Sequence, residues 1–259
     1  MSELKFLGAL HVELLRHSEL HQEHAEHELF QTSTVQALLA GAFDGDVTLG
    51  ELLENGDLGL GTFDGLDGEL IVLDGEAWKA ELDGTLVQPR VSCTSPYAVV
   101  VRFTPGEPVA LSGPFQDPDL ELRLRSRVKA AERPTAIRVD GRFKAVRVRS
   151  VPKQTRPYPS LAAAIAQQQV TDLVDVSGTM VGFRFPDAVD GVEIVGAHLH
   201  FVTDDRTRGG HVLSYTLLEG TAHLDEATWL HVELPPAVDV PRHGVTLDQD
   251  ALRRLETDI

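Results

Sequence analysis

A chain of 259 residues, of which 42% are hydrophobic and 24% charged, has the composition of a folded globular protein and is long enough for one large domain or two small ones. Its 40 acidic residues outnumber the 23 lysines and arginines, giving a formal charge of −17. Such a surface repels phosphate groups and therefore argues against nucleic-acid and anionic-membrane partners. An anionic substrate would need a locally positive pocket, supplied by a metal ion or a buried arginine.

Disulfide, membrane and targeting signals are lacking in the sequence. Cys93 is the only cysteine, which excludes an intramolecular disulfide, and we expect it to be a small buried residue rather than a nucleophile. We find no run of 18 uncharged apolar residues, and we expect no transmembrane helix. The first residues do not have the basic segment, apolar run and cleavage site of a signal peptide, so a cytoplasmic location is the default expectation.

Residues 1–29 differ from the rest of the chain because they are rich in His and Glu and carry a helix-like apolar pattern. His17, His21 and His24 stand at positions i, i+4 and i+7 of that pattern. Two histidines four residues apart on a helix can share a metal ion, so a zinc site is one interpretation. We favour the alternative, a solvated helical arm with interleaved histidines and glutamates.

We expect residues 30–151 to form an N-terminal α+β domain. Two short helices come first, one capped by a Ser or Thr before Val35 and the other capped by Thr48. Short alternating strands joined by Asp-Gly turns follow, and after them a charged helix. The last part of the domain is predicted to be a hairpin whose turn is Asp140-Gly141.

The segment PKQTRPYPS, residues 152–160, is the best candidate for a connection between domains, since its three prolines oppose both helix and sheet. A short helical stretch follows, and the later segments alternate as strands do. Residues 152–259 are therefore predicted to be a β-rich, mostly antiparallel C-terminal domain. The whole chain is predicted to have an α+β fold with two β-rich units enclosing the functional site.

Three histidines in the C-terminal part have the spacing of a metal site. His198 and His200 stand two residues apart in an apolar strand, so both side chains project from the same face. His211 opens the next strand after a loop rich in Asp, Arg and Gly, and a hairpin would return it to that face. Three imidazoles that leave a coordination position open suit a catalytic Zn²⁺, although Fe²⁺, Mn²⁺ and Cu²⁺ also accept imidazole.

Four blocks of sequence in a fixed order resemble the acetolactate decarboxylase family. They run from about Phe30 to the strand after His211, and the likeness continues more loosely toward the C-terminus. In chain order, the blocks are STVQALLAGAFDGDVTLGELLENGDLGLGTFDGLDGELIVLDGE, AIRVDGRFKAVRVRSVPKQTRPYP, VSGTMVGFRFP, and GAHLHF followed by GGHV. Four ordered blocks are far more specific than a histidine triplet alone.

The resemblance implies a zinc-dependent conversion of 2-acetolactate to acetoin and carbon dioxide. It also implies a homodimer, a mixed sheet in the N-terminal part, and a smaller antiparallel or barrel-like unit after it. Matched by motif, the implied site consists of His198, His200 and His211 as zinc ligands, Glu69 as the acid beside the metal, Arg149 as the active-site arginine, Thr62 as a substrate-holding residue and Glu256 as a C-terminal acid.

These implied roles agree with the chemistry of β-keto acids. Zinc would act as a Lewis acid that stabilises the charge left when carbon dioxide departs. Arg149 could hold the substrate carboxylate through a bidentate contact and so orient the breaking bond. Glu69, with Glu256, could then deliver a proton from one face and set the chirality of the acetoin.

Other interpretations of the same residues stay open. From the residues alone, each proposed site residue has a non-functional alternative. Glu69 could be a solvent-facing residue at a strand edge, Arg149 a surface residue of its strand, and Thr62 a strand residue that satisfies a turn. A cupin-like non-haem metal oxygenase would add Asp204 to the histidine pair. A non-catalytic, metal-stabilised β module that binds small acids or a protein partner would need a closed metal site.

Overall fold

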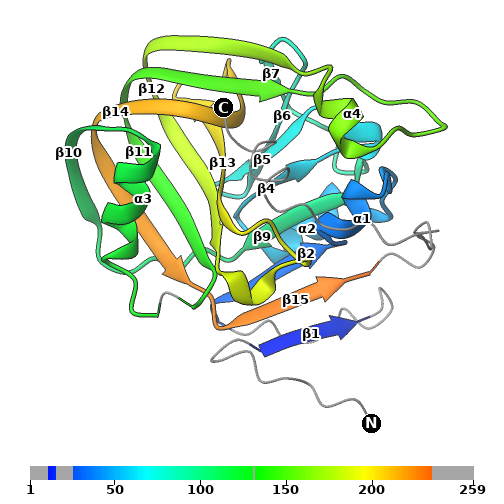
Figure 1. The fold of residues 1–259 in the computed structure, drawn as a ribbon, viewed down its shortest axis with the longest axis horizontal. Helices are drawn as coiled ribbons and strands as arrows, with labels where there is room; N and C mark the ends of the chain where they lie inside the picture. Colours follow the sequence, from blue (N-terminus) through cyan, green and yellow to red (C-terminus); the bar gives the residue numbers. More distant parts are fainter. Residues whose placement is uncertain (1–10, 16–25, 131, 235–259) are drawn as a thin grey trace.

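The computed structural model describes residues 11–15, 26–130 and 132–234, and most of this chain folds into two β-sheets (Figure 1). The larger sheet has eight strands. Its first two pairings are parallel and the others antiparallel, so the sheet is mixed, as predicted. In spatial order the strands are β1 (His11–Leu15), β15 (Trp229–Glu233), β2 (Glu28–Thr32), β9 (Tyr97–Val101), β4 (Leu58–Thr62), β5 (Glu69–Leu73), β6 (Glu76–Ala80) and β7 (Leu86–Val87).

The smaller sheet has five strands, all paired antiparallel. One of its strands, β13, pairs with both β12 and β14, so the pairing of β14, β11, β12 and β13 returns on itself. In spatial order the strands are β10 (Val109–Phe115), β14 (Gly209–Glu226), β11 (Thr135–Ser150), β12 (Gln169–Phe185) and β13 (Gly196–Thr203). A separate two-stranded ribbon joins β3 (Val47–Thr48) to β8 (Thr94–Ser95).

The helices of the described chain are short, and their caps agree with the sequence. Thr34 caps the first helix by accepting a hydrogen bond from the backbone of Ala37, and Thr48 forms a reciprocal capping box with Glu51. Both predicted N-terminal helices are therefore confirmed, and so are the charged helix and the one after the proline-rich segment. The helices are α1 (Val35–Leu39), α2 (Leu49–Asn55), α3 (Asp117–Arg125) and α4 (Leu161–Ile165), with 3₁₀ turns η2 (Asp64–Leu66) and η3 (Asp187–Val189).

The Asp-Gly pairs have two different structural roles. Asp74 and Gly75 both have positive φ and form the two-residue turn between β5 and β6, as predicted. The hairpin predicted at Asp140-Gly141 is wrong, because these residues lie inside the continuous strand β11. A side chain on Gly141 would stand 2.5 Å from the carbonyl oxygen of Glu219, so this glycine is needed for close strand packing and not for a turn.

The N-terminal segment is not helical where the structure describes it. Residues His11–Leu15 form β1, which pairs in parallel with β15 at the edge of the mixed sheet. The helix prediction is wrong there because a neighbouring strand supplies hydrogen bonds that the local pattern cannot reveal. His17, His21 and His24, for which a solvated arm was expected and a zinc site was the less favoured interpretation, lie outside the described residues, as does Glu256.

The two sheets pack face to face around a shared apolar core, and strand β5 packs against β13 and β14. The core joins residues of both sheets, among them Leu60, Ile71 and Val99 from the mixed sheet and Phe183 and Val202 from the antiparallel sheet. A division of the chain at residue 151 does not separate the sheets, because β10 and β11 belong to the second sheet and β15 to the first.

Two smaller observations complete the fold. Cys93 is half-buried beside the apolar cluster that also contains Leu49 and Leu52 of α2, so it is less buried than expected. Within the described residues, no helix is long and apolar enough to span a bilayer.

Candidate metal centre and active site

Three polar side chains form a row across the mixed sheet. Tyr97 of β9 lies opposite Thr62 of β4, and Thr62 lies opposite Glu69 of β5. Directly opposed residues of neighbouring strands project from the same face, so the row faces one side of the sheet. All three side chains are buried, with exposed fractions of 3%, 7% and 9%.

A second row crosses the antiparallel sheet. His200 of β13 lies opposite His211 of β14, and His211 lies opposite Arg149 of β11. His198 precedes His200 by two residues on the same strand and therefore shares its face. The predicted return of His211 to the face of the other two histidines is confirmed.

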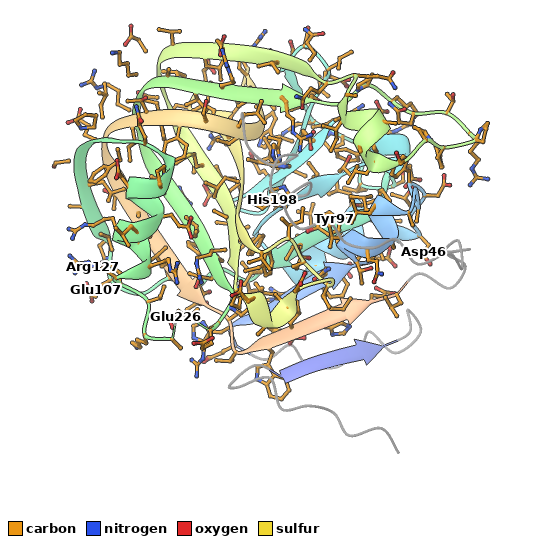
Figure 2. The ribbon with its side chains drawn as sticks, in the orientation of Figure 1. Asp46, Tyr97, Glu107, Arg127, His198 and Glu226 are labelled. Atoms are coloured by element: carbon orange, nitrogen blue, oxygen red, sulfur yellow. The ribbon has the colours of Figure 1, made fainter. Side chains whose placement is uncertain are left out.

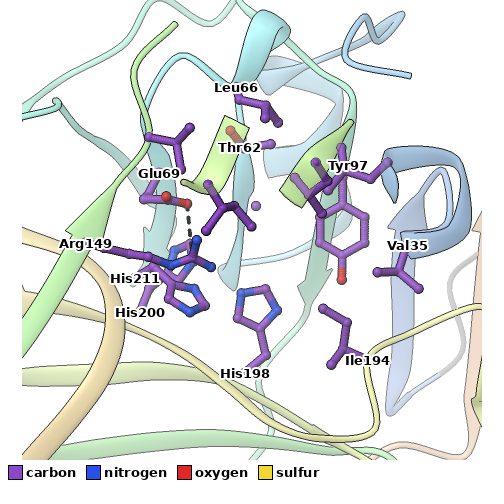
Figure 3. A pocket seen from close by; sticks show the side chains of 15 residues that line it. Val35, Thr62, Leu66, Glu69, Tyr97, Arg149, Ile194, His198, His200 and His211 are labelled. Carbon is purple, nitrogen blue, oxygen red and sulfur yellow. Dashed lines mark ion pairs between the residues drawn. The ribbon is translucent and has the colours of Figure 1, made fainter. Parts of the chain in front are cut away.

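The two rows face each other across a cavity between the sheets (Figure 3). In Figure 2, the labelled Tyr97 and His198 lie in the interior of the view, whereas Glu107 and Arg127 lie at its rim. The cavity volume is about 60 Å³, enough for several ordered water molecules. Its remaining side chains are apolar: Val35, Leu38, Leu66, Val151, Leu161, Ile165 and Ile194.

The three histidines form a compact, buried cluster. Their ring centroids are 4.9–5.3 Å apart, and one ring nitrogen from each lies within 4.8 Å of the others. Zn–N bonds of about 2.1 Å place two nitrogens about 3.4 Å apart on a tetrahedral ion, so small ring rotations would complete such a site. Among the described residues, His198, His200 and His211 are the cluster of potential metal ligands.

Burial keeps the imidazoles neutral, which is the form that binds metal. Burial, together with the positive charge of Arg149, lowers the pKa of His198 to about 3. The pKa of His200 is also well below its ordinary value, first because of burial and then because of His198 and Arg149. Near pH 7 both rings therefore carry a lone pair rather than a second proton.

A backbone hydrogen bond fixes the tautomer of His200. Its Nδ1 lies 2.8 Å from the carbonyl oxygen of Leu70, and because a carbonyl only accepts, Nδ1 must carry the hydrogen. The lone pair is then on Nε2, which has no hydrogen-bond partner among the described residues and lies 3.7 Å from a carboxylate oxygen of Glu69. Metal-binding histidines are typically oriented by such a second hydrogen bond.

Local backbone structure delivers Glu69 and Arg149 to the cavity. The hydroxyl of Thr62 donates to the carbonyl of Gly68 at 2.8 Å and fixes the turn immediately before Glu69. Gly68 has a φ of +84°, and a side chain there would meet the carbonyl oxygen of Ala80 at 2.4 Å. On the other sheet, a side chain at Gly210 would stand 2.7 Å from the carbonyl oxygen of Arg149, so glycine allows that strand to approach.

The structure thus brings together six of the residues named from the sequence: Thr62, Glu69, Arg149, His198, His200 and His211. Asp204, the acid of the oxygenase alternative, is exposed in the turn after β13 and does not line the cavity. The oxygenase alternative therefore loses the acid that the sequence assigned to it.

Sequence reasoning missed two buried residues at this site, Tyr97 and Glu193. The hydroxyl of Tyr97 donates to a carboxylate oxygen of Glu193 at 2.5 Å. No spacing marks Tyr97, which opens an apolar strand. Glu193 does leave a signal, because it is a single acid in an apolar stretch five residues before His198.

A family model described as alpha-acetolactate decarboxylase matches residues 29–242. The chain belongs to the alpha-acetolactate decarboxylase family. It is 41% identical over 228 residues to the alpha-acetolactate decarboxylase of Methanosarcina mazei, covering 88% of this chain and 78% of that protein. With that of Methylococcus capsulatus it shares 38% identity over 236 residues, 91% of this chain and 88% of the relative.

Solved structures of the family have the same fold. The crystal structure of alpha-acetolactate decarboxylase from Bacillus subtilis strain 168 superposes with a TM-score of 0.84 at 33% sequence identity. The superposition covers 89% of this chain and all of that one. The two chains therefore share the same overall fold.

Proposed function

We propose that this protein is a zinc-dependent decarboxylase that converts 2-acetolactate to acetoin and carbon dioxide. The observation that carries the proposal is the cavity itself, in which three clustered histidines face a carboxylate and a buried arginine. Neutral nitrogens, a fixed tautomer at His200 and an open side toward the cavity fit zinc held by His198, His200 and His211.

Arg149 is proposed to bind the substrate carboxylate. In a chain with a formal charge of −17, an anion needs a local positive group, and Arg149 is the cationic side chain among the described residues that line the cavity. A planar guanidinium can donate two parallel hydrogen bonds to a carboxylate, which orients the carbon–carbon bond to be broken.

Zinc at the three histidines would supply Lewis-acid stabilisation for the negative charge that develops when carbon dioxide leaves. Glu69 is proposed to hold the proton that the substrate carbon receives after the bond breaks, and solvent then restores that proton. Its carboxylate enters from the mixed sheet, opposite the histidines, so protonation would occur from one face.

Two further residues complete the proposed site. The Thr62 oxygen keeps lone pairs after donating to Gly68, and it could accept a hydrogen bond from the substrate hydroxyl. Glu256, outside the described residues, is proposed as the second acid on the strength of the family resemblance. A homodimer and a cytoplasmic location belong to the same proposal.

The test is acetoin formation from racemic 2-acetolactate by the purified protein before and after chelation. Activity that disappears with the chelator and returns with Zn²⁺ would support the reaction class and the metal together. A folded protein that binds zinc tightly and releases no acetoin would instead support a metal-stabilised binding module. Acetoin formation that survives complete removal of metal would contradict the zinc-dependent proposal.

A further inference from the structure

Tyr97 and Glu193 form a buried contact between the mixed sheet and the chain segment that leads to the histidines. The exposed fractions of these side chains are 3% and 1%, and the Tyr97 hydroxyl donates to the carboxylate at 2.5 Å. Glu193 lies in the connection between β12 and β13 and is 96 residues from Tyr97 in sequence. A buried carboxylate needs such a partner, because an unmet hydrogen-bonding group is costly in the interior.

The same connection is held to the mixed sheet at a second point. The carbonyl oxygen of Val192 accepts hydrogen bonds from the backbone N–H of Val35 at 3.0 Å and from the side-chain amide of Gln31 at 3.2 Å. Glu193 and Ile194 follow Val192 in the chain. Strand β13 then begins at Gly196, whose φ is +112°, and carries His198 into the cavity. The connection is therefore fixed to the sheet just before it supplies the site.

Both ends of this contact shape the same part of the cavity. Tyr97 continues the row of Thr62 and Glu69, and its ring lines the cavity, as does the side chain of Ile194 next to Glu193. Figure 3 shows Tyr97, Ile194 and Val35 together on one side, with Glu69 and Arg149 on the other. The cavity thus has a polar end with Glu69 and Arg149 and a less polar end with Tyr97, Ile194 and Val35.

We propose that Tyr97 and Glu193 are a positioning pair that sets the size of the less polar end and so determines which alkyl substituent of a branched 2-hydroxy acid fits. The proposal rests on the proposed function, since a carboxylate at Arg149 directs the alkyl group away from the polar end. A wall held in place at the less polar end would leave less room for an alkyl substituent that is longer by one methylene. Discrimination of one methylene by an apolar pocket is typically about 10-fold or more.

The experiment compares two hydroxy acids that cannot lose carbon dioxide by this chemistry because they have no keto group. They are 2,3-dihydroxy-2-methylbutanoate and 2-ethyl-2,3-dihydroxybutanoate, which carry a hydroxyethyl group in place of the acetyl group of the proposed substrate and differ by one methylene in the other alkyl substituent. Isothermal titration of zinc-loaded, full-length protein gives the ratio of their dissociation constants. Wild type should bind the smaller acid about 10-fold more tightly.

Four variants separate positioning from general damage. Tyr97→Phe removes only the hydroxyl, and the double variant Tyr97→Phe/Glu193→Leu also removes the buried carboxylate, so it should fold even where the single variant does not. Glu193→Gln keeps an oxygen that accepts from Tyr97. Tyr158→Phe is the matched control, because its hydroxyl also donates to a carboxylate, that of Asp44, but at an exposed site outside the cavity.

The ratio of the two dissociation constants should fall to about threefold or less in Tyr97→Phe and in the double variant. It should stay near the wild-type value in Glu193→Gln and Tyr158→Phe. An unchanged ratio in the variants that lack the hydroxyl, or an equal loss of affinity for both acids, would overturn the proposal. Absence of acetoin formation by a wild type that still discriminates between the acids would remove the proposed function and leave this inference standing.

Discussion

Replacing Arg149 by lysine tests the proposed carboxylate site while keeping its charge. The side chain is 5% exposed, and its positive charge also contributes to the low pKa of His198 and His200. Lysine preserves that charge, so the histidines should stay neutral and zinc binding should persist. What is lost is the planar fork that donates two parallel hydrogen bonds.

The expected magnitude follows from the loss of one charge-assisted hydrogen bond. Such a bond contributes about 1.5–3 kcal/mol, and each 1.4 kcal/mol corresponds to a factor of 10, so kcat/KM should fall about 10-fold to 100-fold. The matched control is Arg147→Lys on the same strand, where Arg147 forms an exposed ion pair with Asp172. Exposed pairs contribute about 0–1 kcal/mol, so this variant should behave like wild type.

The assay is acetoin formation over a range of substrate concentrations, with zinc content and thermal unfolding measured on the same samples. A folded, zinc-loaded Arg149→Lys variant with wild-type kcat/KM would show that another group binds the carboxylate. An equal loss in the Arg147→Lys control would show that the strand, and not the guanidinium, was disturbed.

Three further predictions concern folding and metal binding. Gly141→Ala should destabilise the protein by about 1–3 kcal/mol in denaturant unfolding, because its methyl group would stand 2.5 Å from the Glu219 carbonyl oxygen. Gly106→Ala, with open space around the glycine, should lower the stability less. Equal effects of the two substitutions would contradict the packing argument. Metal-free protein should lose stability as the pH falls from about 6.5 toward 3, by up to about 1.4 kcal/mol per pH unit for His198. The reason is that the folded-state pKa of about 3 lies below the unfolded value of 6.5, so the unfolded state binds the proton preferentially in this range. A His198→Gln variant with the same slope of stability against pH would exclude this cause. Replacing His17, His21 and His24 by glutamine, which keeps strand β1, should leave the zinc stoichiometry unchanged by mass spectrometry, and loss of the zinc would place the metal on these histidines.

The histidine cluster was predictable because its geometry is local. Alternation along a strand places His198 and His200 on one face, and a hairpin returns His211 beside them. Arg149 was identified only through the family resemblance, since its place beside His211 depends on a pairing between strands about 60 residues apart. Local pattern carries no record of such a register.

The same limit explains the errors in the fold. Asp140-Gly141 has the local signal of a turn, yet tertiary packing uses the glycine for close contact inside a long strand. Residues 11–15 resemble a helix in isolation, and the edge of β15 selects a strand. The contact between Tyr97 and Glu193 joins residues far apart in sequence, so only the isolated acid in an apolar stretch hinted at it.

The most direct test of the central claim is a titration of metal-free protein with Zn²⁺, following carbon dioxide release from racemic 2-acetolactate at each addition. The site of His198, His200 and His211 predicts that activity rises in proportion to bound zinc and reaches its plateau at about one ion per chain. Full occupancy of one zinc per chain without carbon dioxide release would contradict the account, as would full activity before any zinc is added.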